Sequence, residues 1–144
     1  MLNINVICSG TKNTKDSYFR QACAEYEKRL GAYCRIKVTE VGEKDSDIIS
    51  ALPKRSYIIA LCISGKQLSS EELADKIEAL EVSGVSDITF IIGSSEGFGK
   101  SVEEISDFRL SFSKMTFPHR LMRVILLEQL YRAMNINAGG KYHK

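Results

Sequence analysis

The segment Tyr57–Ile63 is apolar at every position, so a strand formed by it has no polar face to turn toward water. A short apolar run of this kind is typical of a strand that is covered on both sides of its sheet. Because helices must then pack on both faces, the run predicts a central strand of an α/β sheet. The residues Ser64–Lys66 predict a turn directly after this strand.

Strand and helix patterns alternate along the rest of the chain. Strands are predicted at 2–8, 35–41, 88–92 and 110–112, helices at 16–33, 69–84 and 121–136, and short helices at 47–52 and from 101. Ser69 with Glu72 has the spacing of a capping box, and Ser101 with Glu104 repeats it. Pro118 suits the first turn of the last helix. This order predicts one α/β domain over residues 1–144, with a mostly parallel sheet, helices on both faces and a ligand site at the carboxyl ends of the strands.

Glycines and serines follow the strand that ends at Ile92, in the loop 93–99. Glycine lets backbone groups approach a ligand closely, and the helix after Pro118 would add free amide groups beside this loop. The glycine spacing fits neither the dinucleotide fingerprint nor a P-loop. From composition alone, the loop is equally consistent with a ligand site and with a structural turn.

The last helix, 121–136, carries apolar residues on more of its circumference than one stripe can use. One apolar face can cover the sheet. The second face predicts a partner subunit, so we expect a homodimer.

Composition narrows the function classes. The net charge of +2 neither demands nor excludes RNA as a partner. The apolar runs are far shorter than the roughly 20 residues that cross a membrane, and the start 1–7 lacks the basic residues of a secretory signal. We therefore expect a cytoplasmic protein without a membrane anchor.

Metal binding is not expected either. The cysteines and histidines of the chain are Cys8, Cys23, Cys34, Cys62, His119 and His143. The cysteines form no Cys-x-x-Cys pair and lie far in sequence from the histidines, so no zinc-site spacing is present. We expect all four cysteines to be reduced and structural.

Several segments together carry a family resemblance. They are 24–30, 64–66, 91–97, 110–119, Arg123, 127–133 and 142–143. These segments closely resemble the RlmH family, ribosomal RNA large subunit methyltransferase H, and they span nearly the whole chain. We therefore expect a complete member of that family.

The resemblance implies a specific fold and activity. The implied fold is of the SPOUT type, with a C-terminal trefoil knot that holds S-adenosylmethionine in a homodimer. The implied reaction methylates N3 of a pseudouridine in a hairpin loop of 23S rRNA, on the assembled ribosome, and needs no metal.

By the same resemblance, the cofactor-binding positions are Leu61, Gly93, Phe112, Ser113, Lys114, Met115, Thr116 and Phe117. Packing in the core is the alternative role of Leu61, Phe112 and Phe117. At Gly93, any side chain would fill space that a cofactor needs.

The proton on N3 must leave during methyl transfer, which requires a base or cations that stabilise the ring anion. His143 is a candidate base, and Tyr142 a candidate to stack on or hydrogen-bond the target. The alternative is a disordered chain end. The family commonly has Arg-Gly before Tyr-His, whereas this chain has Ala138-Gly139, so one cationic contact is missing unless Lys141 or an arginine of another subunit replaces it.

Other polar residues have two interpretations. Arg132 is a candidate phosphate contact, but it also lies four residues after Glu128 and suits a helical ion pair. Arg123 has the same two interpretations. His119 is expected to cap the last helix or to pack, and Ser94 replaces a frequent glycine.

Two other function classes remain open. A non-catalytic nucleotide- or flavin-binding α/β module would use the same sheet and loop, but the chain lacks a phosphate fingerprint. A dimerisation or ribosome-binding factor would explain the apolar last helix, but it gives no role to the loop 93–99.

Overall fold

The computed structural model describes residues 1–10 and 17–144. Its strands are β1 (Asn3–Ser9), β2 (Arg35–Val41), β3 (Tyr57–Gln67), β4 (Asp87–Ile92) and β5 (Phe108–Ser111). Its helices are α1 (Ser17–Leu30), α2 (Asp45–Ser50), α3 (Ser70–Val82), α4 (Lys100–Ile105) and α5 (His119–Asn137). The predicted order of strands and helices is confirmed. The predicted start of the first helix at Asp16 lies outside the described residues.

The strands form one sheet in the order β2-β1-β4-β3-β5, and every neighbouring pair is parallel. The apolar run at 57–63 is an inner strand, as expected, although β4 holds the middle position. Ile4 of β1 pairs with Ile36 of β2 on one side and with Ile88 of β4 on the other. The carboxyl ends of β1, β4 and β3 therefore lie at the same edge of the sheet.

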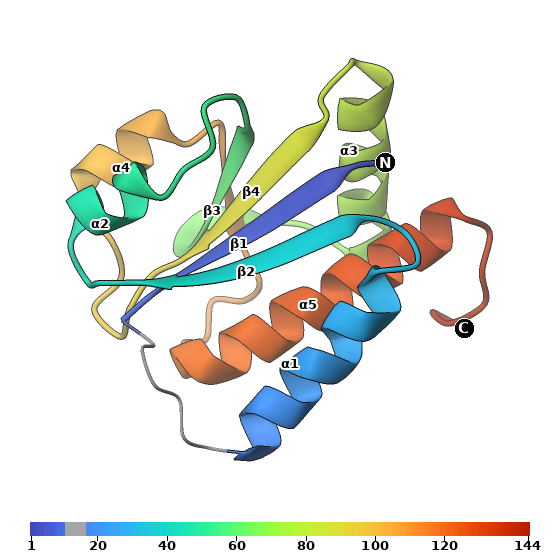
Figure 1. Cartoon of the computed structure of the whole chain (residues 1–144), viewed down its shortest axis with the longest axis horizontal. Helices are drawn as coiled ribbons and strands as arrows, with labels where there is room; N and C mark the ends of the chain where they lie inside the picture. The colour runs from blue at the N-terminus through green and yellow to red at the C-terminus, as the bar shows by residue number, and fades with distance from the viewer. Residues whose placement is uncertain (11–16) are drawn as a thin grey trace.

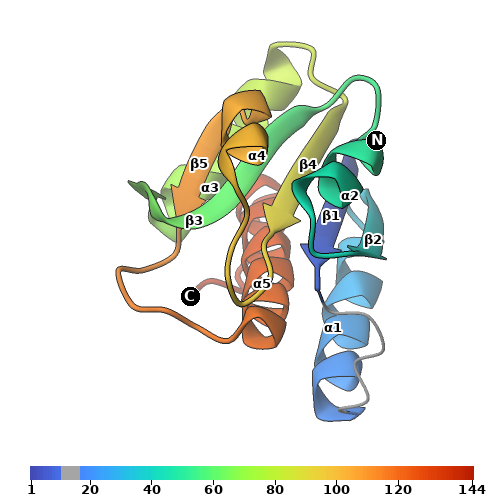
Figure 2. The ribbon, with the colours of Figure 1, turned by 90° about the vertical axis from the view of Figure 1, so that its left-hand side faces the viewer.

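Helices cover both faces, which confirms the expectation from the apolar run (Figure 1). The larger core contains Ile4, Phe90 and Leu130, and lies between the sheet and the helices α1, α3 and α5. On the opposite face, Ile91 and its strand neighbours pack with Ile48 of α2 and Val102 of α4. Figure 2 shows α2 and α4 on one side of the sheet and α5 on the other. The alternation of side chains along β4 thus supplies two separate cores.

The predicted turn at Ser64–Lys66 is wrong, because β3 continues through it to Gln67. The register of β3 with β5 shifts between Leu61 and Lys66, and both residues pair with Leu110. A Cβ atom on Gly65 would lie 2.7 Å from the carbonyl group of Arg109. A glycine therefore serves here as a close contact between two strands rather than as a turn residue.

The predicted capping box at Ser101 is also wrong. The helix α4 begins at Lys100, and its first turn receives the carboxylate of Asp45 from α2. The N–H of Gly99 donates to Asp45 Oδ1 over 2.8 Å. A carboxylate accepts hydrogen bonds at a helix N-terminus more strongly than a neutral hydroxyl does. The capping box at Ser69 and Glu72 is confirmed.

We predict that Gly65→Ala destabilises the fold. The added methyl group would force β3 and β5 apart, which costs about 1–3 kcal/mol by the usual penalty of overpacking. The free energy of unfolding in urea measures this loss. Ser64→Ala, at the exposed neighbouring position, is the control and should change stability by less than about 0.5 kcal/mol. Equal stability of the two variants would contradict the close contact at Gly65.

Candidate active site

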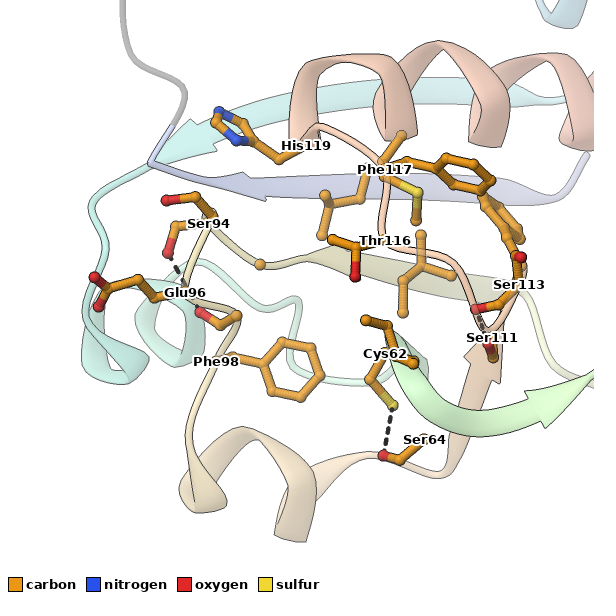
Figure 3. A pocket seen from close by; sticks show the side chains of 18 of the residues that line it. Cys62, Ser64, Ser94, Glu96, Phe98, Ser111, Ser113, Thr116, Phe117 and His119 are labelled. Carbon is orange, nitrogen blue, oxygen red and sulfur yellow. Dashed lines mark hydrogen bonds between the residues drawn. The ribbon is translucent and has the colours of Figure 1, made fainter.

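A cavity of about 560 Å³ lies at the carboxyl ends of β3, β4 and β5 (Figure 3). Its wall comes from residues 61–64 of β3, the last residue of β4 with the loop 93–98, the last residue of β5 with the segment 112–117, and the first turn of α5. This is the edge at which the βαβ order predicts a ligand site. Its volume lies within the range of small-molecule sites.

The cavity brings together all the predicted cofactor residues except Lys114. Those that line it are Leu61, Gly93, Phe112, Ser113, Met115, Thr116 and Phe117. Leu61 is also part of the core and is 6% exposed, so its two proposed roles are compatible. Met115 is 73% exposed and lies at the open side of the cavity.

The loop after β4 folds as a tight turn. The N–H of Gly97 donates to the carbonyl oxygen of Ser94 over 2.7 Å, and Gly97 has a φ of +79°, which favours glycine. A Cβ atom on Gly93 would lie 2.8 Å from the backbone of Gly97. The close packing of this turn therefore requires a glycine at 93, independently of any bound molecule.

The segment after β5 is held by serine hydroxyl groups. Ser111 Oγ donates to the carbonyl oxygen of Ser113 over 2.9 Å, and Ser113 Oγ accepts from the N–H of Met115 over 3.0 Å. Short side chain-to-backbone bonds of this kind fix a loop without secondary structure. The cavity therefore has an ordered, mixed polar and apolar lining.

His119 also lines the cavity, although the sequence predicted a capping or packing role for it. The N-cap of α5 is Pro118, without a side-chain hydrogen bond, so the capping prediction is wrong. Burial, together with the charges of Arg120 and Arg123, lowers the pKa of the imidazole. The neutral form is therefore favoured. The position directly after Pro118, at the start of a helix beside a ligand loop, is the sequence signal that marks His119.

Arg123 forms an ion pair, but with a residue of β2 rather than the helical ion pair that was one of its two predicted roles. Its guanidinium group lies 3.2 Å from the Glu40 carboxylate, and 12% of its side chain is exposed. Arg123 thus joins α5 to the end of β2.

All four cysteines are free, as expected. Burial raises the pKa of the Cys8 thiol, which lies near Arg123, to about 11, so Cys8 is a neutral thiol at physiological pH.

The predicted catalytic residues Arg132 and Tyr142 form a separate cluster with Glu128. Arg132 Nη2 donates to Glu128 Oε2 over 2.8 Å, and the Tyr142 hydroxyl donates to the same oxygen over 3.0 Å. The Arg132 guanidinium group lies 4.9 Å from the centroid of the Tyr142 ring. Burial and hydrogen bonds to Tyr26 and Glu128 raise the pKa of Tyr142, so the phenol stays protonated. The helical ion pair predicted for Arg132 is confirmed.

The C-terminal tail is tied to α5 rather than left loose. Gly139 has a φ of +77° and turns the chain back, and the N–H of Tyr142 donates to Asn135 Oδ1 over 3.1 Å. His143 Nδ1 is buried and has no hydrogen-bond partner among the described residues. None of Arg132, Tyr142 and His143 lines the cavity. Figure 1 shows the C-terminus at the end of α5 opposite to its start. Within one subunit, the tail residues and the cavity therefore lie apart.

Among residues 1–10 and 17–144, no three His, Cys, Asp or Glu side chains are grouped in a way that could hold a metal ion. No helix in the same ranges combines the length and apolar character needed to cross a bilayer.

Proteins of known name resemble this chain over its full length. "Putative ribosomal RNA large subunit methyltransferase H" of Methanococcus maripaludis is 47% identical, over 99% of this chain and 100% of the relative. "Ribosomal RNA large subunit methyltransferase H" of Clostridium novyi and of Bifidobacterium adolescentis are each 45% identical, with the same coverage.

A solved structure and a family model agree with these relatives. A probable methylase family protein from Haemophilus influenzae Rd KW20 has a similar fold, with a TM-score of 0.59 at 14% identity, over 99% of this chain and 70% of that one. The family model described as "Predicted SPOUT methyltransferase" matches residues 2–143. With the sheet, the cavity and the relatives in agreement, the chain belongs to the SPOUT methyltransferase family.

Proposed function

We propose that the chain transfers a methyl group from S-adenosylmethionine to N3 of a pseudouridine in 23S rRNA of the assembled ribosome. The observation that carries this proposal is the cavity at the carboxyl ends of the strands, which gathers the positions that bind the cofactor in the resembled family. The names of the full-length relatives support ribosomal RNA as the substrate. An enzyme that acts on assembled ribosomes works in the cytoplasm.

The cavity residues fit S-adenosylmethionine by size and chemistry. Leu61, Phe98 and Phe112 offer apolar surface for an adenine ring, and the hydroxyl groups of Ser113 and Thr116 offer polar contacts. The sulfonium group of the cofactor supplies an already activated methyl group. The protein must therefore hold the reacting atoms in line, exclude water and remove the N3 proton.

We also propose the trefoil knot that the resemblance implies. The chain leaves β5 at the edge of the sheet, crosses the strand ends in the segment 112–118, and enters α5 (Figure 2). α5 then packs between α1 and α3 and also contacts the middle strand β4. This return from the edge to the middle of the sheet is the path that threading through a loop requires.

A homodimer is the third part of the proposal. Leu121, Ile125, Glu128 and Arg132 recur at helical spacing on the face of α5 opposite to its buried apolar residues. Leu121 is 37% exposed on this face. If a two-fold axis crosses the middle of this face, the second α5 runs antiparallel to the first. The tail of one subunit, with Tyr142 and His143, then lies near the cavity of the other.

The cofactor site is tested by Gly93→Ala. The new Cβ atom would lie 2.8 Å from the Gly97 backbone, so the turn 94–97 must move out of the cavity wall. We expect the Kd for S-adenosylmethionine, measured by calorimetry, to rise about tenfold or more, which is about 1.4 kcal/mol. Gly84→Ala is the control, because Gly84 has a φ of +100° and no neighbour within 4 Å, far from the cavity. Unchanged affinity of Gly93→Ala would remove this loop from the site.

The role of the tail is tested by a chain that ends at Lys141. We expect methyl transfer to ribosomal particles to fall about a hundredfold or more, because Tyr142 and His143, which would cover the docked target base, are lost. The affinity for S-adenosylmethionine should change less than twofold, because the tail does not line the cavity. The full chain should not methylate free nucleosides or a short naked hairpin. Efficient transfer by the truncated chain, or equal rates on the naked hairpin, would contradict the proposal.

The dimer is tested by Ile125→Glu in sedimentation. A carboxylate on the outward face of α5 would be desolvated in the interface, so we expect monomers where the wild type forms dimers at micromolar concentration. Val82→Glu is the control, because Val82 is 84% exposed at the end of α3. A wild type that sediments as a monomer would exclude this dimer.

A further inference from the structure

The proposed reaction needs a group that takes the N3 proton at the place where the target base enters. Among the described residues that line the cavity, His119 is the histidine, and Glu96 is the carboxylate. A carboxylate is a weaker base than an imidazole and its charge opposes the ring anion that forms. The tail histidine, His143, lies away from the cavity of its own subunit. His119 is therefore the candidate proton acceptor that lies at the cavity of its own subunit.

The position of His119 suits contact with an incoming base. His119 is the first residue of α5 and lies beside Ser94 at one end of the cavity, whereas Ser111 and Ser113 lie at the other end (Figure 3). A substrate must enter where the cavity is open, and His119 is only partly buried. The first turn of a helix also has backbone N–H groups without helical partners, which favour a negative charge nearby.

The charge state of His119 suits a proton acceptor. Burial is the largest effect that lowers its pKa, followed by the positive charges of Arg120 and Arg123. The neighbouring segments carry three carboxylates. Glu96 lies in the cavity wall, and Glu40 pairs with Arg123. Glu43 lies close to Gly10, as Ser94 does. The neutral imidazole can accept a proton at physiological pH.

We infer that His119 is a further catalytic residue, whose neutral imidazole contacts the target uracil ring and accepts the proton from N3. The inference rests on the proposed function. As the N3–H bond breaks, the proton goes to an imidazole nitrogen, and the electron pair on N3 forms the bond to the methyl carbon while the sulfonium becomes a neutral thioether. The imidazolium then returns its proton to water.

The first test is the pH dependence of single-turnover methylation of ribosomal particles by His119→Asn. The wild type should lose activity as the pH falls through the pKa of His119, below the ordinary value of about 6.5, because the protonated imidazole cannot accept a proton. In the asparagine variant this acid limb should disappear, and the rate at pH 7.5 should fall about a hundredfold or more. The affinity of the variant for S-adenosylmethionine, measured by calorimetry, should stay within twofold of the wild type.

The second test needs no bound cofactor. The pKa of the His119 imidazole is measured by NMR in the cofactor-free protein, and we expect it below the ordinary value. Arg120→Gln removes one of the charges that lower it, so the pKa should rise. The acid limb of the methylation rate should move to higher pH by the same amount, which a merely structural histidine would not cause.

Two variants serve as comparisons. His143→Asn and Glu96→Gln remove the other candidate acceptors and should keep the acid limb of the wild type. A limb that disappears in either of them, or that persists in His119→Asn, overturns the inference. An ordinary or raised pKa of His119 overturns it as well. If the wild type does not methylate ribosomal particles, the proposed function fails, whereas normal wild-type activity with an unaffected His119→Asn overturns this inference alone.

Discussion

The parallel pairing of β4 with both β1 and β3 is the constraint on which the rest of the structure depends. A parallel neighbour cannot be reached by a short hairpin, so each connection must cross a face of the sheet and return to the same starting edge. Both faces are thereby covered, and side chains such as Phe90 and Ile91 are fully buried on opposite sides. The loops that leave β4 and β5 meet at the carboxyl edge, where the strands no longer pair. The cavity forms there between these loops, the residues 61–64 of β3 and the first turn of α5.

Local pattern was sufficient where an element depends on its own residues. The strand β2 matches its predicted bounds, and the helix after Ser69 begins with the expected cap, because alternation and capping act within a few residues. The extension of β3 and the cap of α4 depend on partners far along the chain. Gly65 lies against β5, and Asp45 reaches the start of α4 from another helix. A short sequence window contains neither partner, so the turn and the capping box were predicted wrongly.

The site shows the same division between local and distant information. Nineteen of the described residues line the cavity, and the motif resemblance had assigned seven of them to the cofactor site; Lys114, which it also assigned there, does not line the cavity. The contacts of the tail were not predictable. They require the reversal at Gly139 and the acceptor Glu128, which joins Tyr142 to Arg132. Arg132, Glu128 and Tyr142 therefore satisfy one another within the subunit at this end of α5.

The helix α5 connects the cavity at its first residue with the tail at its last, over 19 residues without interruption. Its length therefore sets both the separation and the relative rotation of the two clusters. Each residue of a helix advances the chain by about 1.5 Å and turns it by about 100°. Adding a single residue in the middle of α5 would rotate the tail cluster away from its present face, while adding seven would nearly restore that face about 10 Å further along. The length of this helix therefore fixes the position of the tail cluster relative to the cavity.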